Sequence, residues 1–442
     1  MTPEESQVIE NLTTRLKPRC IGRYRIDLPI DFVLNPITTT KLEGVDITIT
    51  PMERYHFDAA LKARHEALRK ERVVGEETAS LLSAAPLSDG AGYVFNRSRD
   101  GTGSVLRALE LLAYRDGYRI EILINARDMD QSKKIRENDT RKTDVPEKLA
   151  HLLNVYERVR GRDDLEIPAE QGLCFANGFL RGEPNDDEDS QIDLYYHLRT
   201  AKDVYFTFHS LSNLIQETTL LERGPAIEEA LKKRNGQTLR KGKRESHGLK
   251  FEEWLSSIES ETSPGMMFHD MTLEVNSKTA TPLTPLFIVD LDSGVEHPGP
   301  ALTLEQAAVH KPLTKATFSA AQTVALWETV TATLRPRPVT AQAAPAAAPV
   351  SATSSAPQAA APRLPLGTAL TSGTRCPQSG TWQCAANAVG GNRRAFTAGE
   401  TLSSVVIPVE RSFLQRIKGA PQSELASTVW TLIAYPDSER PA

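Results

Sequence analysis

The feature that most constrains this chain is a run of small residues and prolines near its C-terminal end. Residues 338–365 read PVTAQAAPAAAPVSATSSAPQAAAPRLP, in which Arg363 is the one charged residue. The run offers few large apolar side chains to bury, and its prolines cannot donate to a helix or a sheet ladder. We therefore expect a semi-stiff linker over 336–366, which separates a large body from a small β-rich module at 367–442.

The composition is that of a globular protein. Of the 442 residues, 40% are hydrophobic and 25% are charged, which argues against wholesale disorder. The formal net charge of −5 excludes a strongly basic nucleic-acid binder. No stretch approaches the roughly 20 apolar residues of a transmembrane helix, and the opening MTPEESQVIENLTTRLKPRC carries no visible signal peptide. We expect a soluble protein with no nucleic-acid partner and no stable membrane span.

The first half of the body carries alternating strand and helix patterns. Period-2 alternation of apolar residues indicates half-buried strands, and stripes at i, i+3, i+4 and i+7 indicate helices. The predicted elements are a strand at Cys20–Pro29, a strand at Val45–Thr50, a helix around Met52–Glu71, a hairpin with an Asp116-Gly117 turn, and a helix from Val145 with Asp144 and Glu147 as its capping box.

The second half repeats this order. Its predicted elements are strands around Ile192–Leu198 and Val204–His209, a helix at Pro225–Arg234, strands near Leu249–Trp254, Met271–Val275 and Leu286–Leu291, and a last helix capped by Ser319 and Gln322. The fold class is therefore α+β, with two similar domains that each pack an antiparallel sheet with two helices. We place these domains at 20–165 and 166–335, after an N-terminal extension at 1–19.

The four cysteines indicate disulfides rather than zinc, because their count is even and they form no C-x-x-C pair. Cys376 and Cys384 enclose the short segment PQSGTWQ, and a bond there would stabilise the small module by roughly 2–3 kcal/mol. Cys20 and Cys174 each open one half, so a bond between them would fix the two domains relative to each other. Buried free thiols remain the alternative. Oxidised cysteines would place the protein outside the cytosol.

Signatures of catalysis are absent from the sequence. It contains no G-x-S-x-G elbow, no G-x-x-x-x-G-K-[ST] loop and no H-E-x-x-H zinc helix, and no pair of its nine histidines has ligand spacing. We therefore predict no catalytic residue, no cofactor-binding residue and no metal ligand. An uncharacterised hydrolase is a third class of function, because convergent sites need only neighbours in space.

Two clusters of charge are candidate partner-binding surfaces. The acidic cluster is the segment 183–189. The basic cluster runs from Lys232-Lys233-Arg234 through 240–244, and we expect a hairpin tip at Lys241-Gly242-Lys243. Solvated loops and a helix C-terminus are the plain alternatives, but both clusters suit electrostatic steering of a protein partner. The candidate residues are Asp186, Asp187, Glu188 and Asp189 in the acidic cluster, and Arg240, Lys241, Lys243 and Arg244 in the basic cluster.

Several longer segments resemble a known family. RCIGRYRIDLP, GLCFANGFLRGE, LLERGPAIEEALKKRNGQTLRKGKRESHGLKFEEWL and TVALWETVTATLRPRP are similar to segments of bacterial immunity proteins against the class-four phospholipase effector of type VI secretion. The resemblance covers about residues 15–335 and rests on structural residues. It implies a two-domain, non-enzymatic inhibitor that binds a toxic lipase in the periplasm and protects the producing cell and its kin. The alternative is an envelope accessory or scaffold protein with no lipase partner.

Overall fold

The structure is a computed structural model. It describes residues 1–36, 38–73, 78–99, 103–131, 142–184, 188–260, 263–295, 313–339, 364–371, 376–384, 393–400, 402, 405–408, 423–426 and 429–435. Most of the predicted linker lies outside these residues, and so do Asp186 and Asp187 of the acidic cluster.

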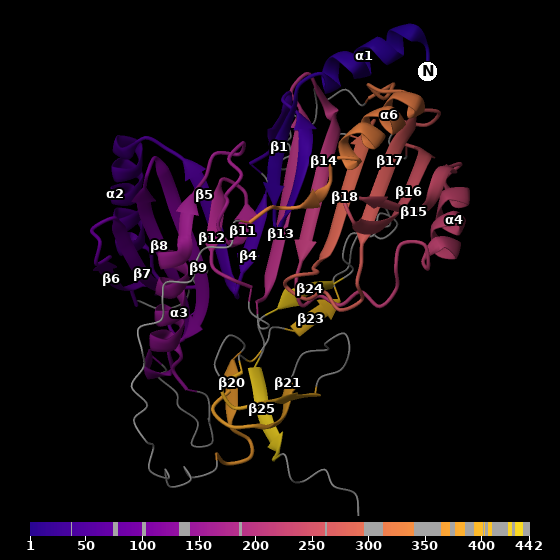
Figure 1. Cartoon of the computed structure of the whole chain (residues 1–442). Coiled ribbons are helices and arrows are strands. Elements are labelled where there is room, and N and C mark those ends of the chain that lie inside the picture. Colours follow the sequence, from indigo (N-terminus) through magenta and orange to yellow (C-terminus); the bar gives the residue numbers. More distant parts are fainter. Residues whose placement is uncertain are drawn as a thin grey trace, which may run out of the picture.

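One 13-stranded antiparallel sheet runs through both halves of the body (Figure 1). Its order is β15-β16-β17-β18-β14-β13-β4-β5-β9-β8-β7-β6, and β3 also pairs with β13. The strands are β3 (Phe32–Leu34), β4 (Thr39–Leu42), β5 (Val45–Pro51), β6 (Leu81–Pro86), β7 (Gly92–Ser98), β8 (Leu106–Arg115), β9 (Tyr118–Arg127), β13 (Ser190–Leu198), β14 (Ala201–Leu211), β15 (Gln237–Ser246), β16 (Leu249–Glu259), β17 (Met267–Val275) and β18 (Leu286–Ser293).

The two halves meet where β4 pairs with β13, with Thr40 opposite Ile192. The prediction of a separate sheet in each half therefore differs from the structure, in which backbone hydrogen bonds join the two sheets edge to edge. The Asp116-Gly117 turn is confirmed, since φ is 49° at Asp116 and 87° at Gly117, as a tight hairpin requires.

Two small sheets lie at the junction between the halves. One contains β1 (Leu16–Ile21), β2 (Tyr24–Pro29) and β19 (Arg335–Pro336), and the other contains β10 (Val159–Gly161), β12 (Gly178–Arg181) and β11 (Gly172–Phe175). The single strand predicted at Cys20–Pro29 is wrong, because the chain reverses at Gly22, where φ is 56°. A Cβ at Gly22 would lie 2.7 Å from the Ser210 hydroxyl, so the site requires glycine for space as well as for φ.

The helices of the body are α1 (Pro3–Thr13), α2 (Arg54–Lys70), the short η1 (Met129–Gln131), α3 (Val145–Arg158), α4 (Gly224–Lys233) and α6 (Ala320–Thr331). The capping box of Ser319 and Gln322 at α6 is confirmed. The one predicted for α3 is wrong: Asp144 makes no side-chain cap, and its carboxylate accepts a hydrogen bond from the Arg127 amide at 2.6 Å.

The main core contains residues of the sheet and of α1, α3 and α6. Phe206 and Phe208 of β14 are fully buried in it, together with Trp327 of α6. The Trp327 indole donates to the Glu253 carboxylate at 3.1 Å, so this large side chain is buried with its polar atom paired.

The C-terminal module contains a four-stranded sheet and a two-stranded one. Its strands are β20 (Ala369–Thr371), β21 (Gly380–Cys384), β22 (Arg393–Phe396), β25 (Val429–Ala434), β23 (Val405–Pro408) and β24 (Ser423–Ala426). Trp382 and Trp430 fill its core with Cys376 and Cys384. The disulfide predicted between these cysteines differs from the structure, in which no bond joins them and the Cys376 thiol donates to the Gln378 carbonyl at 3.0 Å.

Candidate functional site

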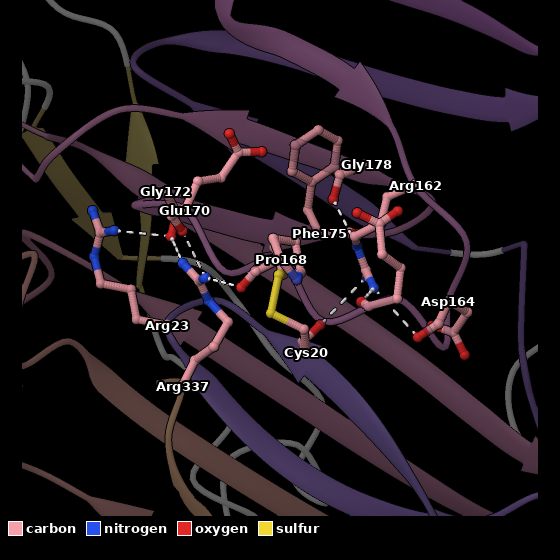
Figure 2. The surroundings of a disulfide bond; sticks show 12 residues. Cys20, Arg23, Arg162, Asp164, Pro168, Glu170, Gly172, Phe175, Gly178 and Arg337 are labelled. Carbon is pink, nitrogen blue, oxygen red and sulfur yellow. Dashed lines mark hydrogen bonds between the residues drawn. A yellow bond between two sulfur atoms is a disulfide. The ribbon is translucent and has the colours of Figure 1, made fainter. Parts of the chain in front are cut away.

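A disulfide joins the two halves of the body covalently. Cys20 at the end of β1 is bonded to Cys174 in β11, 154 residues later, with a Cα–Cα distance of 5.7 Å. Both residues are fully buried. Two backbone hydrogen bonds accompany the disulfide. The Gly22 amide donates to the Cys174 carbonyl at 2.8 Å, and the Cys174 amide donates to the Gly22 carbonyl at 2.9 Å. This confirms the predicted pairing and places the joint between β1 and β11 in the protein interior; Figure 2 shows the surroundings of the bond.

A buried arginine fills the space beside the disulfide. Arg162 is 1% exposed, and its guanidinium donates to carbonyls of segments on both sides of the junction (Figure 2). The acceptors are the carbonyls of Cys20, Asp163, Asp164, Glu166, Phe175 and Gly178, at 2.7 to 3.5 Å. Burial lowers the pKa of this guanidinium. The carbonyls stabilise the charge that burial disfavours, and through them Arg162 connects Cys20 of the first half to Phe175 and Gly178 of the second.

Two further arginines converge on the carbonyl of Gly172. Arg23, in the turn between β1 and β2, reaches it at 3.2 Å, and Arg337, after β19, reaches it at 2.8 Å. Arg337 also donates to the carbonyls of Pro168 and Glu170, and burial lowers its pKa to about 10. The first hairpin and the last strand of the body are thus attached to the same residue of the second half.

Glu188 of the predicted acidic cluster is part of this junction. It is 5% exposed and forms an ion pair with Arg23. Burial, with a smaller contribution from the nearby Glu43, raises its pKa to about 7. Glu188 therefore does not belong to the exposed patch predicted for 183–189. Asp189 is half-buried, and its carbonyl accepts a hydrogen bond from the Glu43 amide at 2.6 Å.

The candidate residues of the basic cluster lie along β15, which is one edge of the long sheet. Arg240 pairs with Glu253 and Glu328, Arg244 pairs with Glu253, and Lys241 pairs with Glu228 and lies 4.4 Å from the Trp254 ring centre. The side chain of Lys243 is 80% exposed, with its Nζ 3.8 Å from Glu252. Neighbouring carboxylates therefore neutralise much of the positive charge.

The predicted hairpin tip at Lys241-Gly242-Lys243 is wrong. These residues lie in the middle of β15, and the chain reverses at His247 and Gly248, where φ is 49° and 79°. The Lys-Gly-Lys sequence instead belongs to an edge strand in which exposed and partly buried residues alternate. Charged side chains on an edge strand disfavour pairing with another sheet.

Within the described ranges, no group of three or more His, Cys, Asp and Glu side chains could hold a metal ion. No helix in the described part of the chain is long and apolar enough to cross a membrane.

The buried arginines carry no signal in the sequence. Arg162 is followed by Asp163 and Asp164, and this charged segment is typical of a solvent-exposed loop. Arg337 lies among prolines at the start of the predicted linker. No periodic pattern marks either residue, because their acceptors are backbone carbonyls contributed by distant segments.

Comparisons with known proteins agree with this architecture. The model of the family described as Tle cognate immunity protein 4 N-terminal domain matches residues 17–162, and that of its C-terminal domain matches residues 166–339. No curated protein sequence matches the chain significantly.

Solved structures share the fold of the body. The apo structure of the type VI secretion immunity protein TplEi from Pseudomonas aeruginosa is similar with a TM-score of 0.55 and 19% identity, over 74% of this chain and 99% of that chain. A chain in a structure described as the Tle4-Tli4 complex is similar with a TM-score of 0.56 and 19% identity, over the same shares. Since the two family models together match most of the sequence, the chain belongs to the Tle cognate immunity protein 4 family, a family of immunity proteins and not of enzymes.

Proposed function

We propose that this chain binds and inhibits a cognate phospholipase effector of the type VI secretion system, and so protects the producing cell and its kin. The observation that carries the proposal is the match of both family domains, in order, along residues 17–339. A similar solved chain comes from a structure described as the Tle4-Tli4 complex, which favours an effector partner over a scaffold role.

The rigidity of the body supports this function. An inhibitor needs a surface that fits its target, and each group that must be ordered on binding lowers the affinity. The shared sheet, the Cys20–Cys174 bond and the buried Arg162 hold the two halves in one arrangement before any partner arrives. A stable complex would bury about 1,600 Å² of surface in total.

We further propose the division into an extension at 1–19, immunity domains at 20–165 and 166–335, a linker at 336–366 and a module at 367–442. In this division α2 and α3 pack with the first part of the sheet, and α4 and α6 with the second. A periplasmic location fits the buried disulfide, because such bonds form and persist in oxidising compartments.

The basic cluster on β15 remains a proposed steering surface. Lys243 is its most exposed side chain, so Lys243→Glu is the variant that tests it. Rim charges act on association rates more than on dissociation rates. We expect Lys243→Glu to change the association rate with the effector and its dependence on salt. If Lys243→Glu and the wild type associate with the effector at equal rates at every salt concentration, the basic cluster is not part of the interface.

Co-expression tests the proposed function directly. The cognate phospholipase effector is sent to the periplasm of a host, either with this protein or with an unrelated exported protein as the control. We expect lysis with the control, survival with this protein, and co-purification of the two chains as one complex. Lysis in both cultures together with separate elution would refute the proposal.

A further inference from the structure

The loop that connects the two halves lies against the disulfide. We call residues 163–170, between β10 and β11, the cover loop; no helix or strand includes them. Cys20, Cys174 and Phe179 form a small apolar cluster in which all three side chains are fully buried. In the part of the chain that the structure describes, Ile167 of the cover loop is the partly buried apolar side chain that packs against this cluster. Since the cluster itself has no exposed surface, Ile167 shields it from solvent on this side.

The first part of the cover loop, residues 163–166, is fixed to buried groups of the junction. Arg162 donates to three of its carbonyls at 2.7 to 3.3 Å. The Asp164 carboxylate accepts a hydrogen bond from the Tyr196 hydroxyl at 2.6 Å and pairs with Arg19 at 2.7 Å. Because Tyr196 and Arg19 are themselves buried, we expect this part to stay in place when the rest of the loop moves.

Two arginines hold the second part of the cover loop, residues 167–170. Arg337 donates to the carbonyls of Pro168 and Glu170 (Figure 2). The Glu170 carboxylate also pairs with Arg160 at 3.2 Å, and both of these side chains are partly exposed. Arg337 comes from the last segment of the body, so its release would free this part of the loop and leave the contacts of the first part intact.

The cover loop has the properties of a segment that opens locally. It lies outside regular secondary structure and is held by long side chains at a partly exposed site, and such segments open at a lower free energy than the whole domain. Thiol–disulfide exchange requires a thiolate in contact with a sulfur atom of the bond. Both cysteines are fully buried, so the bond has to be uncovered before it can react.

We propose that the cover loop is a lid over the Cys20–Cys174 bond, and that opening of this lid, without unfolding of the body, sets the rate at which external dithiols reduce the bond. A thiolate of the dithiol attacks one sulfur and displaces the other as a thiolate, which takes up a proton. The second thiol of the dithiol then forms a disulfide within the reductant and releases the first cysteine, so the protein gains two hydrogens and the dithiol loses two. A closed lid keeps the joint between the halves covalent in the presence of dithiols.

The test follows the reduction of the folded full chain by excess dithiothreitol, well below the urea concentration at which the body unfolds. Samples are quenched in an acidic denaturant that contains N-ethylmaleimide and are then digested with trypsin. Mass spectrometry measures the reduced fraction in the peptides that contain Cys20 and Cys174, so the thiols of the C-terminal module do not contribute to the result.

Two variants loosen the lid in different ways. Arg337→Met frees the second part of the cover loop, and Ile167→Ala removes the shielding side chain. Arg335→Met is the matched control, because Arg335 lies two residues before Arg337 and pairs with Asp27 instead of with the loop. When opening is fast relative to exchange, the rate follows the equilibrium population of the open form. We expect reduction about 30-fold faster in Arg337→Met, about 10-fold faster in Ile167→Ala, and within about 3-fold of the wild type in the control.

The dependence on urea distinguishes lid opening from unfolding. Lid opening exposes little surface, so the reduction rate should rise much less with urea than the rate of global unfolding of the same protein, measured by circular dichroism. A wild-type reduction rate that equals the global unfolding rate at each urea concentration would refute the lid. Reduction of Arg337→Met and Ile167→Ala at the wild-type rate, or an equal acceleration in Arg335→Met, would also refute it.

Discussion

Removal of the disulfide between the halves should lower the stability of the body by a calculable amount. The perturbation is the double variant Cys20→Ala/Cys174→Ala. The bond spans 154 residues, and on the chain-entropy account a loop of this length restricts the unfolded state by about 5 kcal/mol. With an unfolding entropy of about 2.1 cal/mol/K per residue over about 320 residues, this corresponds to a decrease of about 7 °C in Tm.

Differential scanning calorimetry without reductant measures this shift. The variant also loses two buried sulfur atoms, which lowers its stability independently of the bond. The second reference is therefore the reduced wild type, which is unfolded and refolded in reductant and keeps both sulfur atoms. A Cys376→Ala/Cys384→Ala variant is the control, because those residues lie in the core of the separate module. We expect its effect to be confined to the unfolding of the module.

One combination of results would show that the Cys20–Cys174 bond does not stabilise the body through loop entropy. Intact-mass measurement must first show that the wild type is two hydrogens lighter than its reduced form. If the oxidised wild type and the Cys20→Ala/Cys174→Ala variant then unfold within about 1 °C of each other, the bond does not stabilise the body by restricting its unfolded chain.

Other predictions concern the buried charges of the junction. Because the pKa of Glu188 is raised to about 7 in the folded state, above its ordinary value of 4.5, the folded protein binds the extra proton between these values. The contribution of this proton to the free energy of unfolding is fully present below pH 4.5 and is lost as the pH rises to 7, by roughly 3 kcal/mol at most. Urea unfolding of Glu188→Gln should show no such decrease between pH 4.5 and 7. A decrease in the variant equal to that of the wild type would contradict the prediction. Arg162→Met should cost at least about 3 kcal/mol in urea unfolding, because it removes the charged donor of the buried carbonyls of Cys20, Phe175 and Gly178. The control Arg160→Met removes partly exposed ion pairs with Glu166 and Glu170 and should cost about 1 kcal/mol or less, and equal costs would contradict the role of Arg162.

Local patterns in the sequence predicted the individual elements well. The hairpin turn at Asp116-Gly117, the capping box at Ser319 and the helix before Asn235-Gly236 depend on residues within a few positions of each other, and the structure contains all three. The capping box of α3 was wrong because Asp144 could bond either to its own helix or to β9. The Arg127 amide of β9 is the partner that it takes.

Features that depend on distant segments could not be predicted in this way. The pairing of β4 with β13 depends on how two sheet edges meet in space. The alternating pattern of an edge strand is the same with or without a neighbouring strand, so the sequence does not reveal the pairing. The Cys20–Cys174 bond was proposed because each cysteine opens one half, yet the sequence did not decide between a bond and two thiols. Glu188 was expected to be exposed because it lies in an acidic run, but its partner Arg23 lies 165 residues earlier.

The ends of the body pair with each other, which has a consequence for how the chain folds. Residues of β19 pair with β2, the Asp27 amide donates to the Thr333 hydroxyl across 306 residues, and α1 packs on α6. Because the chain is synthesised from its N-terminus, the hairpin of β1 and β2 lacks some of its native neighbours until the last segment of the body has been made. Contacts of such separation slow folding and prolong the exposure of apolar strands. During that delay β2 keeps an open edge, and an open strand edge is a site where another chain can pair.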